Sequence, residues 1–128
     1  MELPVVNHPD YVAKINDDNK FPIKKFGALA EYLLKENVVK KFYIPKECSI
    51  KTMQTSHSLE YINHIKNKSL DIKLQKKIGF PINDSVVRRS FVATGGTVLA
   101  SKLAMGTKLA CNTAGGSHHA TFNCGAGY

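Results

Sequence analysis

Apolar residues recur at helical spacing along much of the chain. A helix is predicted from about residue 24 to residue 36, because its apolar residues fall on one face: Phe26, Leu29, Ala30, Leu33 and Leu34. Residues 49–68 show the same spacing in two pieces, and the polar residues 56–58 predict a break between them. Three helical segments therefore precede the longest one.

The longest predicted helix begins near Ser85, which can cap it, and ends at Gly106. Its apolar positions are Val87, Phe91, Val98, Leu99 and Leu103. Gly95 and Gly96 fall in its middle, where each glycine costs about 1 kcal/mol relative to alanine. The pair predicts either close backbone packing at this point or a kink.

Shorter apolar runs predict strands at residues 3–7 and 108–113, and an extended segment at residues 38–44. The run at 108–113 is expected to be buried, because it is built on Leu109, Ala110 and Cys111. Short strands that alternate with helices predict an α/β layered fold with parallel pairing. Only two or three strands can be counted, so the sheet would be narrow.

The composition describes one globular domain of 128 residues, with 43% hydrophobic and 22% charged residues. No apolar run approaches the length that crosses a bilayer. Cys48, Cys111 and Cys124 have no CxxC spacing, which favours reduced thiols over a disulfide framework. We therefore expect a cytoplasmic protein without a membrane partner.

The net charge of +8 comes mainly from scattered lysines, since 16 of the 18 basic residues are Lys. Lysines spread among helix-forming residues indicate solvated helix faces rather than a nucleic-acid surface. No RNP, zinc-finger or KH pattern occurs in the sequence. Nucleic acid is therefore disfavoured as a partner, although a non-catalytic basic binding module is the alternative function.

All ten acidic residues lie at or before Asp84, so the last 44 residues contain none. This acid-free segment carries His118 and His119, just beyond the predicted strand at 108–113, where open α/β sheets bind ligands. Adjacent imidazoles could make two proton transfers at one reacting centre, or they could lie in an idle surface loop. A working histidine needs a carboxylate or carbonyl to fix its tautomer, and no carboxylate is near in sequence. With Cys124 the pair has no zinc-site spacing, so no metal site is predicted within the chain.

Six short motifs occur in order along the chain. They are HPDY (8–11), KFPIKKF (20–26), SHSLEYI (56–62), RRSFVATGGT (88–97), NTAGGSHHA (112–120) and GAGY (125–128). Together they resemble the zinc-dependent histone deacetylase family, including its bacterial acetoin-utilisation and amidohydrolase-like members. The resemblance covers essentially the whole chain, and it implies part of a three-layer α/β/α, arginase/deacetylase-like fold with an incomplete parallel sheet.

The resemblance implies hydrolysis of acetyl-lysine or another acylated amine, with a zinc ion that activates water. By carry-over, His119 is the general base that takes the water's proton. His118 gives electrostatic help and protonates the leaving amine. Gly127 and Tyr128 fall where the family has a wall of the acyl-lysine tunnel.

The family's zinc ligands, an Asp-x-His pair and a later Asp, are absent from this sequence. Residues 1–128 are therefore expected to be the N-terminal part of a histone deacetylase-like domain, truncated before the zinc ligands. We expect the chain alone to bind no zinc and to be inactive. The alternative is one half of a split deacetylase, completed by a C-terminal fragment on a second polypeptide.

Overall fold

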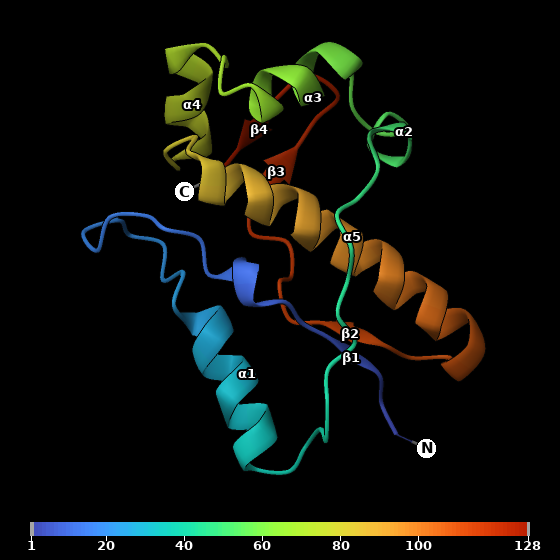
Figure 1. Ribbon diagram of the computed structural model, residues 1–128. Helices are drawn as coiled ribbons and strands as arrows, with labels where there is room; N and C mark the ends of the chain where they lie inside the picture. Colours follow the sequence, from blue (N-terminus) through green and yellow to red (C-terminus); the bar gives the residue numbers. More distant parts are fainter. Residues whose placement is uncertain (1, 128) are drawn as a thin grey trace.

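One long helix, α5 (Asp84–Thr107), crosses the middle of the structure (Figure 1). The structure is a computed structural model, and it describes residues 2–127. The elements on one side of α5 include a strand pair. They are β1 (Val5–Val6), the 3-10 helix η1 (Pro9–Tyr11), α1 (Lys25–Lys35) and β2 (Cys111–Asn112). Short helices and a hairpin lie on the other side: α2 (Ile50–Met53), α3 (Leu59–Lys66), α4 (Ile72–Ile78), β3 (His119–Ala120) and β4 (Gly125–Ala126). No helix in the described part is both long enough and apolar enough to cross a membrane.

The two strand pairs differ in direction. β1 and β2 are parallel, with Val5 opposite Cys111 and Val6 opposite Asn112. Tyr43 bridges to Val6 in the parallel sense, which extends this pair at one position. β3 and β4 form an antiparallel hairpin that the sequence did not predict. The molecule is a mixed helical protein with small sheets, and its parallel pair is compatible with a partial α/β fold.

The strands are shorter and less covered than the sequence predicts. The expectation of a buried strand at 108–113 is wrong, because Leu109 is 71% exposed and Cys111 is also exposed. β2 pairs only with β1 among the described strands, so its outer edge is open. Residues 38–44 contribute the single bridge at Tyr43 rather than a strand.

The ends of α5 differ from the predicted ones. Asn83, not Ser85, caps the first turn, because its side chain accepts a hydrogen bond from the Val86 N–H (2.9 Å). Ser85 lies inside the helix and accepts a hydrogen bond from the Lys14 N–H instead (2.6 Å). At the other end Gly106 is helical, and Lys108 takes the left-handed conformation that ends the helix.

The glycine pair in the middle of α5 permits close packing, as predicted. A Cβ atom at Gly95 would overlap the Lys46 carbonyl oxygen. A Cβ atom at Gly96 would overlap the Tyr11 hydroxyl, which donates to Asn112 Oδ1 (2.9 Å). The helix runs unbroken from Asp84 to Thr107, so these glycines serve contact with neighbouring backbone and side chains.

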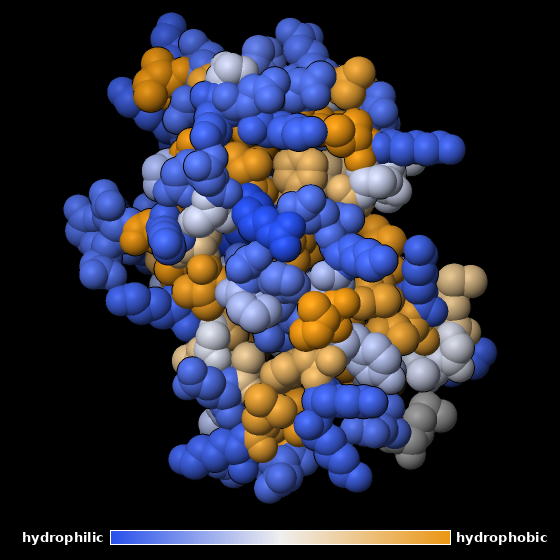
Figure 2. Space-filling view, viewed as in Figure 1, coloured by the Kyte–Doolittle hydropathy of each residue, from blue (hydrophilic) through white to orange (hydrophobic). Residues whose placement is uncertain are grey.

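The other predicted helices are confirmed as α1, α2 and α3, with the break at residues 54–58. The predicted apolar face of α1 is only partly covered, since Phe26 is buried whereas Leu29 and Leu34 are exposed. Figure 2 shows separate apolar patches among polar ones on the face that carries α1. α4 was not predicted; Asp71 caps it, and Gly79 ends it at a φ of 78°.

The main core lies under η1 and the first half of α5. Its members are apolar side chains from both halves of the chain: Tyr11, Ala13, Phe21, Ile23, Phe26, Leu70, Ile78, Phe80, Val86, Val92 and Ala114. Tyr11 and Val92 are fully buried at its centre. This core fixes the base of α5 against the segment that carries the two histidines.

Candidate functional site

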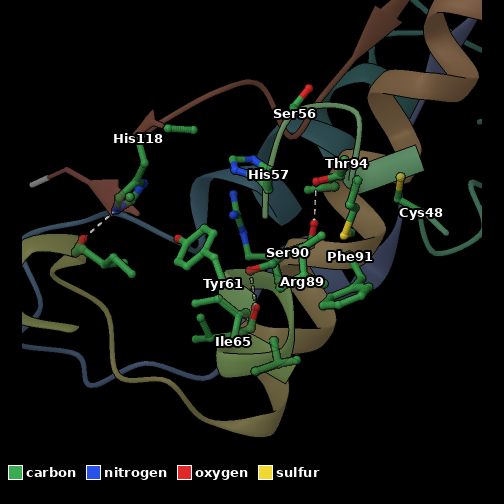
Figure 3. Close-up of a pocket in the computed structure, with 18 of the residues that line it drawn as sticks. Cys48, Ser56, His57, Tyr61, Ile65, Arg89, Ser90, Phe91, Thr94 and His118 are labelled. Atoms are coloured by element: carbon green, nitrogen blue, oxygen red, sulfur yellow. Dashed lines mark hydrogen bonds between the residues drawn. The ribbon is translucent and has the colours of Figure 1, made fainter. Parts of the chain in front are cut away.

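A cavity of about 490 Å³ lies between α3, α5 and the segment 115–125 (Figure 3). Its walls are largely apolar and include Met53, Ile62, Ile65, Ile78, Phe80, Val86 and Phe91. The polar groups that reach it include Ser56, His57, Arg89, Ser117, His118 and His119. The structure thus brings both predicted catalytic histidines to one cavity.

Hydrogen bonds and aromatic rings of the described residues hold His118 in place. Its Nε2 lies 2.8 Å from the Ile78 carbonyl oxygen, and its Nδ1 lies 2.9 Å from the Ser117 hydroxyl. A carbonyl oxygen can only accept, so Nε2 carries the proton and Nδ1 accepts from Ser117. The ring packs on Phe80 (centroids 4.5 Å apart) and on Phe21 (6.0 Å). The imidazole is therefore fixed in one tautomer.

Burial lowers the pKa of His118 below its ordinary value, and the nearby positive charges of Arg89 and His119 lower it further. The hydrogen bond to Ile78 acts in the opposite direction but is outweighed. His118 is accordingly neutral at pH 7. If Nδ1 takes up a proton, the Ser117 bond must reverse, with Nδ1–H donating to the hydroxyl oxygen.

His119 has a different environment from His118. It lies in β3, opposite Ala126 of β4, and its side chain is exposed. At His118, the Ile78 carbonyl orients the imidazole ring, which is a role that a carboxylate could also perform.

Of the predicted tunnel-wall residues, Gly127 contacts this site and Tyr128 lies outside the described residues. The Gly127 N–H donates to the Lys77 carbonyl (2.9 Å), which ties the chain to the end of α4. A Cβ atom at Gly127 would overlap the His118 ring. A glycine is therefore needed beside His118 for the observed packing.

Two further residues of the cavity were not predicted. His57 lies between α2 and α3, and its Nδ1–H donates to the Thr121 carbonyl (2.8 Å). The Ser58 N–H also donates to the Phe122 carbonyl. These two bonds hold the loop between β3 and β4 against the segment that separates α2 from α3. Arg89 enters the cavity from α5 (Figure 3). His57 belongs to the motif SHSLEYI and Arg89 to the motif RRSFVATGGT, and these motifs were the sequence features that could have pointed to the two residues.

The zinc that the sequence resemblance implies has no matching ligand set in the described part. No group of three or more His, Cys, Asp or Glu side chains there is arranged to hold a metal ion. The two ring nitrogens of His118 are already bonded to a hydroxyl and a carbonyl. The described residues therefore do not fit zinc by themselves.

Comparison with known proteins gives consistent matches. The family model described as "Histone deacetylase domain" matches residues 20–128. An uncharacterized protein of Picosynechococcus sp. (strain ATCC 27264 / PCC 7002 / PR-6) is 39% identical over 130 residues, covering 100% of this chain and 43% of the relative. Histone deacetylase 2 of Arabidopsis thaliana is 27% identical over 124 residues, covering 84% of this chain and 30% of the relative. The chain spans less than half the length of these two relatives.

Proposed function

This chain belongs to the histone deacetylase family, and from this premise we propose that it supplies the N-terminal part of a domain that hydrolyses acyl-amide bonds, such as that of acetyl-lysine. The observation that carries the proposal is the family match over residues 20–128, taken with the position of both histidines on one cavity. An acetylated lysine, or another acylated amine, is the substrate class that the family implies.

The proposed fold is part of a three-layer α/β/α arrangement, in which residues 1–128 form the first portion of the sheet. The parallel pairing of β1, β2 and Tyr43 supports it. The open outer edge of β2 also supports it, because an unpaired edge can accept a further strand. That strand would come from later in the same polypeptide or from a second one.

In the proposed reaction His119 takes the proton from the attacking water, and His118 stabilises charge and protonates the leaving amine. The exposure of His119 supports the first role, since a general base must reach solvent-derived water. The fixed, neutral His118 needs its lowered pKa to rise before it can act as an acid. Completion of the site by a carboxylate beside His118 would have that effect.

Zinc, when bound, supplies the activation of water in this family. Its ligands would be the Asp-x-His pair and the later Asp, which this sequence does not contain. We therefore propose that the 128-residue chain alone is inactive and that the remaining ligands come from additional polypeptide. This proposal includes the split arrangement, in which a second chain provides them.

A chimera tests the proposal directly. Residues 1–128 are fused to the part of the Picosynechococcus relative that follows the aligned region, and hydrolysis of an acetyl-lysine peptide is measured with added zinc. We expect turnover by the chimera, and a loss of roughly 10²- to 10⁴-fold in His119→Ala. The matched control is His64→Ala, because His64 contacts Glu60 and Ser69 away from the cavity.

The isolated chain provides the second arm of the experiment. Under the same conditions we expect no release of acetate from the peptide by residues 1–128. Turnover by the isolated chain that is abolished in His119→Ala would refute the proposed need for further ligands. A folded chimera that binds zinc yet is unaffected by His119→Ala would refute the proposed role of that histidine.

A further inference from the structure

The side-chain amide of Asn112 joins segments that are far apart in the sequence. Its Oδ1 accepts hydrogen bonds from the Tyr11 hydroxyl (2.9 Å) and from the Ala114 N–H (3.3 Å). Its Nδ2 donates to the Ala93 carbonyl and to the Thr97 hydroxyl, both at 3.2 Å. Oδ1 accepts two bonds and Nδ2 donates two, so the whole capacity of the amide is used. Because an N–H can only donate and a carbonyl can only accept, Ala114 and Ala93 together allow one orientation of this amide.

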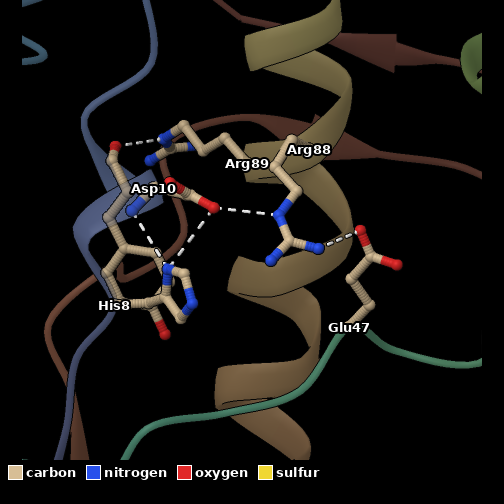
Figure 4. Close-up of polar contacts among 6 residues, drawn as sticks. His8, Asp10, Glu47, Arg88 and Arg89 are labelled. Atoms are coloured by element: carbon tan, nitrogen blue, oxygen red, sulfur yellow. Dashed lines mark hydrogen bonds and ion pairs between the residues drawn. The ribbon is translucent and has the colours of Figure 1, made fainter.

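Two of the elements that the amide joins, η1 and α5, are also held to each other by separate contacts. Tyr11 is completely buried in the main core. The Nε of Arg89, in α5, donates to the Tyr11 carbonyl (2.9 Å), and the adjacent Arg88 pairs with Asp10 of η1 (2.9 Å) (Figure 4). η1 and α5 therefore form a joined frame, and Asn112 is bonded to both parts of it.

The bond to the Ala114 N–H shapes the turn that leads from β2 to the two histidines. It closes an Asx turn, and the Gly115 N–H donates to the backbone carbonyl of Asn112 (3.3 Å). Gly115 has a φ of 57°, which glycine adopts at little cost. Apart from chain neighbours, a Cβ at Gly115 or Gly116 would meet no atom within 4 Å, so packing does not hold these two residues. The bonded turn therefore sets the direction in which the chain approaches His118.

We propose that Asn112 is a positioning residue for the tandem histidines, an inference that rests on the proposed function. The amide of Asn112 holds the first end of segment 112–118, and the hydrogen bond from His118 to the Ile78 carbonyl (2.8 Å) holds its last end. If the first end is released, the loosely packed glycines let the imidazole leave Ile78 for part of the time. Asn112 is not among the residues that line the cavity, so it acts through the turn and touches no reacting atom.

The test compares two substitutions of Asn112 in the isotopically labelled 128-residue chain by nuclear magnetic resonance. Asn112→Ala removes all four side-chain bonds, so the ring nitrogen resonances of His118 should move from those of one tautomer toward the average of both. Asn112→Asp keeps an oxygen for the Ala114 N–H and places its other oxygen against the Ala93 carbonyl. Both variants should be less stable than the wild type, but Asn112→Asp should keep the wild-type His118 resonances.

Thr97→Val is the matched control, because it removes a partner from the opposite side of the same amide and keeps the shape of the side chain. Its His118 resonances should match those of the wild type. In the chimera described above, Asn112→Ala should lower kcat by roughly tenfold or more with little change in KM, and Asn112→Asp should restore most of the loss.

Unchanged His118 resonances in a folded Asn112→Ala chain would overturn the proposal, and so would an equal displacement of these resonances in Asn112→Asp. If Asn112→Ala does not fold, hydrogen exchange of the Ala114 amide in the wild-type chain decides. Slow exchange supports the Asx turn, whereas exchange as fast as in the unfolded chain would overturn the proposal. A wild-type chimera without turnover would refute the proposed function instead, and the comparison of His118 resonances would still test the role of Asn112.

Discussion

The backbone of Gly127 lies directly against the imidazole of His118, so closely that a Cβ atom at position 127 would overlap Cδ2 and Nε2 of the ring. The ring has little freedom to move, because it is bonded to the Ile78 carbonyl and packed on Phe80. We expect Gly127→Ala to break the Nε2 hydrogen bond to Ile78 and turn the ring out of its present position.

The change can be followed in the imidazole nitrogen and carbon resonances of His118, which report its tautomer and hydrogen bonds. Gly116→Ala is the matched control, since no atom lies within 4 Å of a Cβ at Gly116. Its His118 resonances should match those of the wild type. Unchanged His118 resonances in Gly127→Ala would show that the close contact does not exist in solution.

His118 should titrate below the ordinary histidine value of about 6.5. Burial is the main cause, and the charges of Arg89 and His119 add to it. As the pH falls below about 6.5, the unfolded chain takes up the proton before the folded chain, so stability decreases. A pH titration of the His118 ring resonances measures this pKa, and Arg89→Met should raise it. A titration at or above 6.5 in the wild type would contradict the buried, neutral state.

Local periodicity predicted the helices well, because the signal lies within a few turns of chain. α1, α2, α3 and α5 all occur where apolar spacing placed them. The cap of α5 was misassigned because Asn83 and Ser85 are both good capping residues, and the choice depends on Lys14, far away in sequence. Contacts between distant segments are not encoded in a local pattern.

The candidate site was predicted in part. The sequence placed His118 and His119 together beyond a strand, and both line one cavity. It did not reveal that Ile78 would orient His118 or that the ring would pack on Phe80. Those partners lie about forty positions earlier in the chain, so no local spacing connects them with His118.

Tyr11 should make the folded chain sensitive to alkali. Burial raises the pKa of Tyr11 to about 12, although the charge of Arg89 acts in the opposite direction. Between about pH 10 and pH 12 the unfolded chain loses the phenol proton first, so stability decreases as the pH rises through this window. Tyr11→Phe should lose about 1 kcal/mol at neutral pH, with its bond to Asn112, and show a flatter alkaline decline.

Denaturant unfolding at a series of pH values measures this effect. Tyr32→Phe is the matched control, because Tyr32 is 58% exposed on α1. It should leave both the neutral-pH stability and the alkaline decline unchanged. An alkaline decline in Tyr11→Phe as steep as that of the wild type would assign the effect to other groups.

The glycines of α5 allow the close packing to be tested within one helix. Gly95→Ala should lose about 3 kcal/mol of unfolding free energy, at the upper end of the usual cost of overpacking, because the Lys46 carbonyl belongs to the backbone and cannot move aside easily. Gly106→Ala is the matched control in the same helix, where no atom lies within 4 Å of the new Cβ. There alanine should add about 0.5 to 1 kcal/mol through helix propensity.

Gly96→Ala offers a sharper version of the same test. Its Cβ would overlap the Tyr11 hydroxyl, so Tyr11→Phe removes the atom that it meets. The cost of Gly96→Ala should therefore be smaller in the Tyr11→Phe background than in the wild type, and a double-mutant cycle measures the difference by denaturant unfolding. Because Asn112 also lies close to this Cβ, the relief should be partial. Strictly additive effects would mean that Gly96 and Tyr11 are not in contact and that α5 sits farther from η1.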